Sequence, residues 1–535
     1  MLTLRLCQVV LPPAFLEDTL GTVAPGITYS NITNGTGIIA QDGDRTVAVI
    51  DPTTGETTFY PRYEGLNPSF EISTERNITY IDNPDLFPVD DLNITVIQGP
   101  NLYGAVHTQD GNESNAAPYL SHVFAQRVIN LNGNELGVRG PGSKAMLGFG
   151  ANHTLQSFNY LWHPAKRNST IKPNSVVQIH DAILAQLGLA AQLGPLTVDA
   201  VEACYYDSAA SHIQPVYWFS ATRNLTSSGN GTQFNARISG YVPVGSYALE
   251  PLPNLLAPPL DTVPPAIPSP PSTPSPPPST IQRRSRSQLT KRAPTVTVGR
   301  YVIQQDDAGW LASAQNFWPA LTKYAAGKVN FVSQGFYWAY PWLYTTNAAQ
   351  FANSVTLLLT EAHGNWDKFS TYQQERSSVV NIGDIPSTGY GAGSGGALKF
   401  WVLHSCEVIP SNTDYPNDGR GGYSSFDVWW SVFNGLHAVM GYRTEMWIHD
   451  GVTTPFGQAV GNGVSVVGAW MSAVLNDQTW YKAGKGNMYL DGNRGIQEPM
   501  GRASSVSVCG HTDDVVWDGE NLGRPGCLFE WWYDN

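Results

Sequence analysis

Two apolar runs, each about the length of one β-strand, most constrain how this chain can fold. The first, residues 355–362, leads into His363, and the second, residues 397–403, leads through His404 and Ser405 to Cys406. The segment between them is long enough for a crossover connection, so the pattern predicts two buried parallel strands whose carboxyl ends share one sheet edge. Ligands and chemistry gather at that edge in open α/β sheets. A histidine and a cysteine there are the minimum parts of a thiol nucleophile and its base.

The carboxyl-terminal half alternates strand and helix patterns. Residues 295–304 and 328–340 read as strands, and residues 306–324 carry apolar side chains at helical spacing between them. Later in the chain, residues 438–442 read as a buried strand and residues 458–475 as a helix. This alternation predicts an α/β fold, a mostly parallel sheet flanked by helices.

The amino-terminal half reads differently, as an α+β pattern. Residues 46–51 and 57–60 flank a Pro/Gly turn and predict a hairpin, and residues 175–187 have helical apolar spacing. A Pro/Ser-rich stretch then separates the halves and is expected to be extended, without a core. We therefore expect a degenerate leader at 1–20, an α+β domain at 21–250, a Pro/Ser-rich basic linker at 251–294 and an α/β domain at 295–535.

An apolar strand followed by His363-Gly364, and another followed by Ser405-Cys406, resembles the caspase, legumain, gingipain and clostripain clan of cysteine peptidases. The resemblance covers the last 240 or so residues and is closest to an uncharacterised group of secreted caspase-like domains. It implies a cysteine endopeptidase with a Cys406–His363 dyad and an oxyanion hole formed by the backbone amides of Gly364 and Cys406. Ser405 stands where the clan usually has alanine, and no local caspase signature surrounds Cys406.

Each of these side chains also has a purely structural interpretation. His363 could be a buried structural histidine, and Cys406 an inert core thiol. His404 is two residues before Cys406 on the same strand face, which makes it a rival base or a metal ligand. Paired metal-ligand spacing such as Cys-x-x-Cys does not occur, so we expect neither metal nor other cofactor. Three acids could line a pocket for a basic side chain or could simply be solvated; they are Glu407, Asp414 and Asp427.

Composition bears on partners and compartment. The net charge is -13, which argues against nucleic acid because that partner needs a basic face. No apolar run reaches the length of a transmembrane span. Asn-x-Ser/Thr sequons crowd into the amino-terminal half and favour a glycosylated, secreted protein. They are Asn31, Asn34, Asn77, Asn93, Asn112, Asn152, Asn168, Asn224 and Asn230.

Cysteines and basic pairs suggest two covalent events. Five cysteines leave at least one unpaired, and Cys509 and Cys527 are close enough in sequence to form a disulfide. Lys291-Arg292 lies in the linker and is the kind of site that secretory processing proteases cut, although a basic linker can also be only a solvated spacer. Cleavage there would make residues up to 292 a prosegment.

Two functional classes stay open. The first is a secreted cysteine peptidase acting on a peptide or protein substrate. The second is a non-catalytic secreted protein of the same fold that binds glycans or proteins through aromatic side chains such as Trp366, Trp429 and Trp430.

Overall fold

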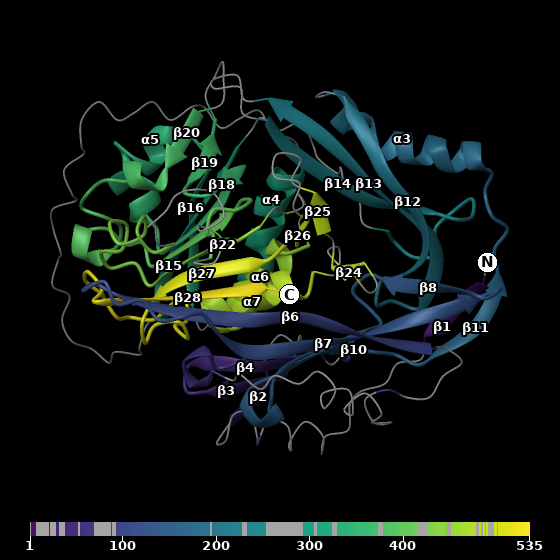
Figure 1. Cartoon of the computed structure of the whole chain (residues 1–535), viewed down its shortest axis with the longest axis horizontal. Helices are drawn as coiled ribbons and strands as arrows, with labels where there is room; N and C mark the ends of the chain where they lie inside the picture. Colours follow the sequence, from purple (N-terminus) through teal and green to yellow (C-terminus); the bar gives the residue numbers. More distant parts are fainter. Residues whose placement is uncertain are drawn as a thin grey trace.

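The apolar runs become neighbouring strands of a large sheet in the computed structural model of the chain (Figure 1). The structure describes residues 2–6, 21, 28–31, 38–51, 54–68, 87, 93–192, 195–226, 233–252, 293–303, 308–323, 329–372, 378–411, 414, 425–444, 446, 451–477, 481–482, 485–486, 488–490, 497–499 and 501–534. The linker cleavage site Lys291-Arg292 lies outside them, as do Asn34, Asn77 and Asn230.

The carboxyl-terminal half supplies one end of the sheet and a group of helices. Its main strands are β15 (Thr295–Val302), β16 (Asn330–Trp338), β17 (Leu357–Glu361), β21 (Phe400–His404), β22 (Ala438–Tyr442), β27 (Ala503–Val508) and β28 (Cys527–Asp534). Shorter strands are β18 (Gly364–Asn365), β19 (Lys368–Thr371), β20 (Ser378–Asn381), β23 (Tyr481–Lys482), β24 (Lys485–Gly486), β25 (Met488–Leu490) and β26 (Gln497–Pro499). The helices are α4 (Ala308–Lys323), α5 (Pro341–Tyr344), α6 (Thr453–Gly461) and α7 (Val466–Leu475).

Parallel pairing organises the first five of these strands. They lie in the order β16-β15-β17-β21-β22, and all are parallel. Counted among these five alone, that is the second, first, third, fourth and fifth strand along the chain. Strand order therefore reverses between β15 and β17. In open α/β sheets this reversal point opens a crevice at the carboxyl ends of the strands. The expected α/β arrangement of parallel strands with helices is thus present, and β27 and β28 extend it with antiparallel pairs.

The helix layer is fixed to this sheet by large side chains. Phe317 of α4 stacks on Phe456 of α6, with ring centroids 5.6 Å apart, and Phe456 meets Trp470 of α7 edge to face. The Trp470 indole N–H donates to the Gly441 carbonyl of β22 at 2.9 Å. We expected one helix over residues 458–475; instead two helices are broken near Gly463, whose φ of 89° is left-handed and ends α6.

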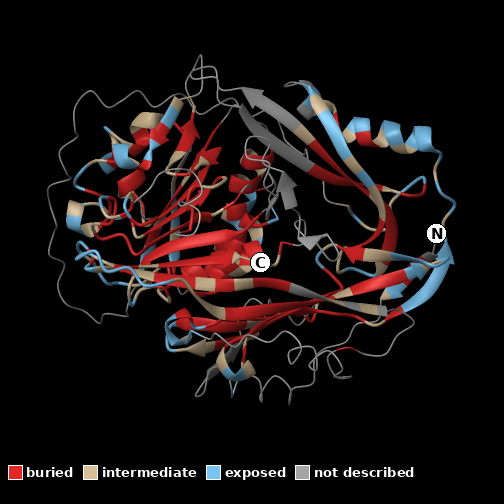
Figure 2. Ribbon diagram, viewed as in Figure 1, coloured by how far each residue is buried: buried red, intermediate tan, exposed pale blue. Residues whose placement is uncertain are grey.

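The amino-terminal half is mostly strand. Its strands are β1 (Leu2–Leu6), β2 (Thr28–Asn31), β3 (Ile38–Asp42), β4 (Arg45–Ile50), β5 (Thr57–Phe59), β6 (Asn93–Thr108), β7 (Ala117–Leu131), β8 (Asn134–Arg139), β9 (Lys144–Phe149), β10 (Leu155–Leu161), β11 (Ala165–Thr170), β12 (Leu196–Asp207), β13 (His212–Thr226) and β14 (Gln233–Pro243). The predicted hairpin is β4–β5, and the predicted helix is α3 (Val176–Gln192), which lies on the outside of the molecule (Figure 2). Within the stretch expected as a leader, β1 pairs with β11 and β13 and buries Leu4.

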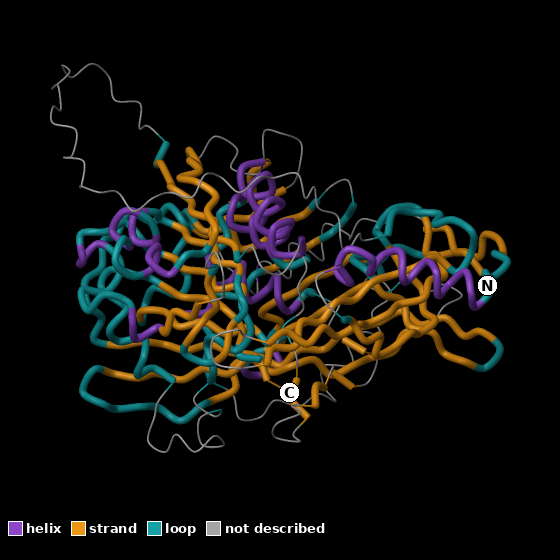
Figure 3. The backbone as a smooth tube through the Cα atoms, turned by 90° about the horizontal axis from the view of Figure 1, so that it is seen from above, coloured by secondary structure: helices purple, strands orange, loops and turns teal. Residues whose placement is uncertain are grey.

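The two halves share one sheet. β6 pairs antiparallel with β28 from Asn101 opposite Asp534 to Thr108 opposite Cys527, and β6 continues into β7 (Figure 1). Seen from above, strands extend along most of the length of the molecule (Figure 3). Tyr63 packs edge to face on Trp531, and Arg45 pairs with Asp513 at 3.0 Å. The proline-rich linker therefore divides the sequence, but the sheet and main core run across that division.

Candidate functional site

His363 and Cys406 follow adjacent parallel strands. β17 and β21 pair in register from Leu357 opposite Phe400 to Glu361 opposite His404. Beyond the strands, the Ala362 N–H still donates to the His404 carbonyl, at 3.4 Å. Both residues consequently leave the sheet at its carboxyl edge, beside the reversal point of the strand order.

Gly364 brings the two strand ends into contact. A Cβ built on Gly364 would lie 2.2 Å from the Cys406 carbonyl oxygen, 2.4 Å from a Val408 methyl and 2.9 Å from the Ser405 Cβ. Only a residue without a side chain fits against this backbone. The segments His363-Gly364 and Ser405-Cys406 are thus in direct van der Waals contact, as the dyad hypothesis requires of their backbones.

The surroundings of His363 hold it in place. Its backbone N–H donates to the Ser370 Oγ at 3.1 Å, and its carbonyl accepts the Ser370 N–H at 2.8 Å. The edge of the Trp310 indole, from α4, meets the imidazole with ring centroids 4.5 Å apart. His363 is buried, with 7% of its surface exposed.

Cys406 lies in a sharp turn and is partly exposed. The Ser405 N–H donates back to the Leu403 carbonyl at 2.9 Å, which turns the chain as soon as β21 ends. Glu407, the next residue, has a φ of 50°, a left-handed conformation that costs energy for a residue with a side chain. The Met446 N–H points at the Cys406 sulfur, 3.4 Å away. A donor in this position stabilises negative charge on sulfur, which is the nucleophilic form.

His404, the rival base that its position in the sequence suggested, has one ring nitrogen occupied by another partner. Its side chain is fully buried, and its Nδ1 lies 2.5 Å from Oε2 of the equally buried Glu361. The Ser313 hydroxyl of α4 donates to the other Glu361 oxygen at 2.8 Å. Sequence reasoning passed over Glu361 because its partner is 43 positions away and becomes a neighbour only through the pairing of β17 with β21. This pair joins the last residues of β17 and β21, and the Ser313 hydrogen bond ties α4 to it.

The other pocket candidates differ in their partners and in their exposure. Asp414 forms a close ion pair with Arg443, at 2.7 Å, and accepts the Ser411 hydroxyl. Its charge is therefore already compensated. Asp427 is exposed, and Glu407 is half-buried directly after Cys406. Of the three acids, only Glu407 is a neighbour of Cys406 in the chain.

The predicted disulfide is present. Cys509 and Cys527 are bonded, with Cα atoms 5.5 Å apart, and link the end of β27 to the start of β28. Cys406 and Cys204 are the free cysteines of the described residues. Cys204 is buried, which raises the pKa of its thiol to about 11, whereas Cys406 is partly exposed.

Three sequons can be judged for accessibility. Asn112, Asn152 and Asn168 are exposed, as glycan attachment requires. Asn31, Asn93 and Asn224 lie in strands, but their side chains are outside the described set. Glycosylation stays a prediction.

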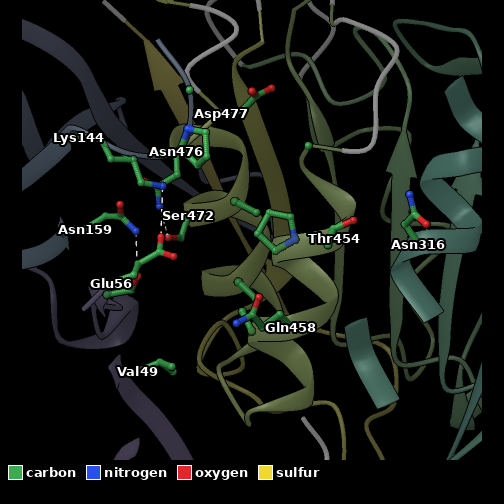
Figure 4. Close-up of a pocket in the computed structure, with 18 of the residues that line it drawn as sticks. Val49, Glu56, Lys144, Asn159, Asn316, Thr454, Gln458, Ser472, Asn476 and Asp477 are labelled. Carbon is green, nitrogen blue, oxygen red and sulfur yellow. Dashed lines mark hydrogen bonds and ion pairs between the residues drawn. The ribbon is translucent and has the colours of Figure 1, made fainter. Parts of the chain in front are cut away.

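The two halves of the chain enclose a cavity. A cavity of about 560 Å³ separates α4, α6 and α7 from strands of the amino-terminal half (Figure 4). Hydroxyl and amide groups are frequent in its wall, and Glu56 pairs with Lys144 at 3.3 Å on one side. The opposite wall carries Asn316, Thr454, Gln458, Ser472 and Asn476. The sequence carried no signal for this cavity, because its two walls are joined only by the fold.

Comparison with known proteins adds one finding. Residues 336–499 match the model of a domain of unknown function (DUF6345), a stretch that includes both His363 and Cys406. No curated protein matches the chain. Among the described residues, none of the helices combines the length and the apolar character needed to cross a bilayer.

Proposed function

We propose that the protein is a cysteine peptidase in which Cys406 is the nucleophile and His363 the acid–base partner. The observation that carries the proposal is the close approach of Gly364 to the Cys406 carbonyl, which brings the two strand ends together. The position of both residues at the carboxyl edge, beside the reversal of strand order, supports it further. So does the strained turn at Glu407, since left-handed residues with side chains cluster at active sites.

The reaction would proceed by acyl transfer. His363 takes the proton of the Cys406 thiol, and the resulting thiolate attacks the carbonyl carbon of a peptide bond, forming a C–S bond while the C=O electron pair moves onto oxygen. The backbone amides of Gly364 and Cys406 would hold that oxyanion. Collapse of the intermediate breaks the C–N bond, and the leaving amine takes the proton from His363. Water, deprotonated by His363, then hydrolyses the thioester and restores the thiol.

Secretion and processing belong to the same proposal. A glycosylated, disulfide-bonded chain cut after Arg292 by a processing protease would be a proenzyme of a familiar kind. The shared sheet adds a condition, because cutting the linker would leave β6 paired with β28. Activation would therefore require more than one break in the chain, or would not require release of the amino-terminal half at all.

The test is hydrolysis of a fluorogenic peptide library by the purified chain, intact and cut at the linker. Cys406→Ala and His363→Ala should each remove the activity while the fold is retained by circular dichroism. Cys204→Ser is the matched control, since it removes a buried free thiol and should leave activity unchanged. Activity that survives Cys406→Ala, or its absence from the cut wild type on every peptide, would refute the peptidase proposal.

A binding function is the second candidate, and the inter-half cavity favours it. Its volume is within the range of small-molecule sites, and its amides and hydroxyls suit a neutral polyhydroxylated ligand such as an oligosaccharide. Of the aromatic side chains expected to bind such a ligand, Trp366 and Trp429 are buried, and Trp430 is half-buried. An oligosaccharide that raises the melting temperature of the wild type, but not of Gln458→Leu, would support this function; no shift with any member of a broad glycan panel would exclude it.

A further inference from the structure

A cluster of metal-ligating side chains lies at the opposite edge of the sheet from Cys406. His437 immediately precedes β22, so it is at the amino end of a parallel strand, whereas Cys406 follows the carboxyl end of its neighbour β21. His511 and Asp514 lie in the connection between β27 and β28. One potential ligand atom from each of these three residues lies within 4.8 Å of the other two.

The two imidazoles converge on one carboxylate oxygen. The Nδ1 of His437 is 2.6 Å from the Asp514 Oδ2, and the Nδ1 of His511 is 2.9 Å from the same oxygen. The two rings stand nearly perpendicular, with centroids 5.6 Å apart. Nitrogen and oxygen ligands of a tetrahedral ion are roughly 3.3 Å apart when each bond is about 2.0 Å. An ion would therefore move each nitrogen about 0.4–0.7 Å further from the Asp514 oxygen and bring the two histidine ligand atoms, now within 4.8 Å, to about 3.3 Å from each other.

The hydrogen bonding of His437 favours a cation at this point. Its Nε2 faces the Glu520 carbonyl at 3.2 Å, and a carbonyl can only accept. A neutral imidazole that donates from Nε2 has a lone pair on Nδ1, and that lone pair would face a carboxylate oxygen 2.6 Å away. A proton on Nδ1 instead would satisfy Asp514 but leave the Nε2 lone pair facing the Glu520 carbonyl oxygen. A metal ion on Nδ1 lets Nε2 keep its proton and donate to that carbonyl, so both contacts become favourable. Donation of the outer ring N–H to a backbone carbonyl is also how metal-bound histidines are usually oriented.

The surrounding structure holds the three side chains in place. His437 is fully buried, and its carbonyl accepts the Val508 N–H at 2.9 Å. The Asp514 carbonyl accepts the Val466 N–H at the start of α7, and the Cys509–Cys527 disulfide closes the loop at its base. His511 and Asp514 keep some exposure, 19% and 14% of their side chains, so an ion can reach them from solvent. The nearby Lys399 ammonium donates to the Glu520 carbonyl at 2.8 Å.

We propose that His437, His511 and Asp514 bind one divalent transition-metal ion of the zinc class. Two imidazoles and one carboxylate are ligands that Zn²⁺ prefers, and water would complete a tetrahedral set. Because the site is at the amino edge of the sheet, its role is to fasten the β27–β28 loop. The same loop carries Asp513, which receives hydrogen bonds from Arg45 and from the Tyr63 N–H. The ion would thus also stiffen the contact between the two halves.

The experiment uses the full chain, without an affinity tag, after dialysis against a chelator. Zn²⁺ binding is measured by competition with a chromophoric chelator, and Co²⁺ is used as a spectroscopic probe. We expect one equivalent of Zn²⁺, Co²⁺ d–d bands of tetrahedral intensity without thiolate charge-transfer absorption, and a higher melting temperature with Zn²⁺. His511→Ala, a partly exposed loop residue, should weaken Zn²⁺ binding by about 100-fold or more and abolish the thermal shift.

Two control variants make the result specific. His180→Ala removes an exposed histidine that also contacts an aspartate, Asp181, and should bind Zn²⁺ like the wild type. Cys406→Ala should do the same, because its thiol is at the other edge of the sheet. The proposal is overturned if the wild type takes up no Zn²⁺ under these conditions, if His511→Ala binds it equally well, or if Cys406→Ala loses it.

Discussion

Replacement of Gly364 by alanine should separate the two strand ends on which the proposed chemistry depends. The added Cβ would lie 2.2 Å from the Cys406 carbonyl oxygen, about 1 Å less than the roughly 3.3 Å of close carbon–oxygen contacts in proteins. It would also meet Val408 and Ser405, so neither backbone can relax easily. Overpacking of this kind costs about 1–3 kcal/mol of folding free energy. A displacement of about 1 Å between reacting groups can cost about 100-fold in rate.

The assay combines urea unfolding with peptide hydrolysis and Cys406 alkylation. The free energy of unfolding of Gly364→Ala should be about 1–3 kcal/mol below that of the wild type, and most of the peptidase activity should be lost. Gly383→Ala is the matched control, because its Cβ would meet nothing within 4 Å, and it should stay within about 0.5 kcal/mol of the wild type. If Gly364→Ala is as stable and as reactive as Gly383→Ala, the strand ends do not meet as described, and the reasoning fails.

Three further predictions concern the scaffold. Burial lowers the pKa of His122 to about 4, so the free energy of unfolding is not reduced by this group above pH 6.5 and falls by about 3 kcal/mol as the pH drops towards 4. Urea titrations at several pH values should show a smaller decline for His122→Asn. Burial raises the pKa of Glu530 well above its ordinary value, so the stability that the neutral carboxyl provides is lost as the pH rises through its pKa in the folded protein. The melting temperature of Glu530→Gln should therefore rise relative to that of the wild type between pH 5 and 8, and a constant difference would contradict this. A chain cut after Arg292 should give two bands on a denaturing gel but one particle by size-exclusion chromatography, because β6 stays paired with β28; separation into two particles would show that this pairing is weak.

Local pattern was enough to predict the strands around the site. β17, β21 and β22 are short, continuous apolar runs, and such runs are typical of strands buried on both faces. Their parallel orientation follows from the segments between them, which are long enough for crossover connections. Contacts over long sequence distances were not predictable, because no local signal records them. The pairing of β6 with β28 and the burial of Glu361 against His404 are of this kind.

Two local predictions were wrong for identifiable reasons. The apolar spacing that ends at Gly435 predicts a helix capped by Ser424 or Ser425. Residues 425–432 form turns instead, and the Ser425 hydroxyl donates to buried Glu530 at 2.7 Å, whereas Ser424 lies outside the described residues. The pattern of residues 369–379 predicts a helix or a loop, but they include parts of β19 and β20, an antiparallel pair that positions Ser370 against His363. In both cases a contact with a residue outside the segment decided the outcome.

The pH dependence of Cys406 alkylation, followed residue by residue by peptide mapping, tests the central claim most directly. If His363 activates the thiol, Cys406 in the wild type should react with iodoacetamide at pH 6.5 at least about ten times faster than in His363→Ala, while buried Cys204 stays unlabelled in both. Equal Cys406 rates in the two proteins across the pH range would show that the imidazole does not act on the sulfur, and would contradict the dyad.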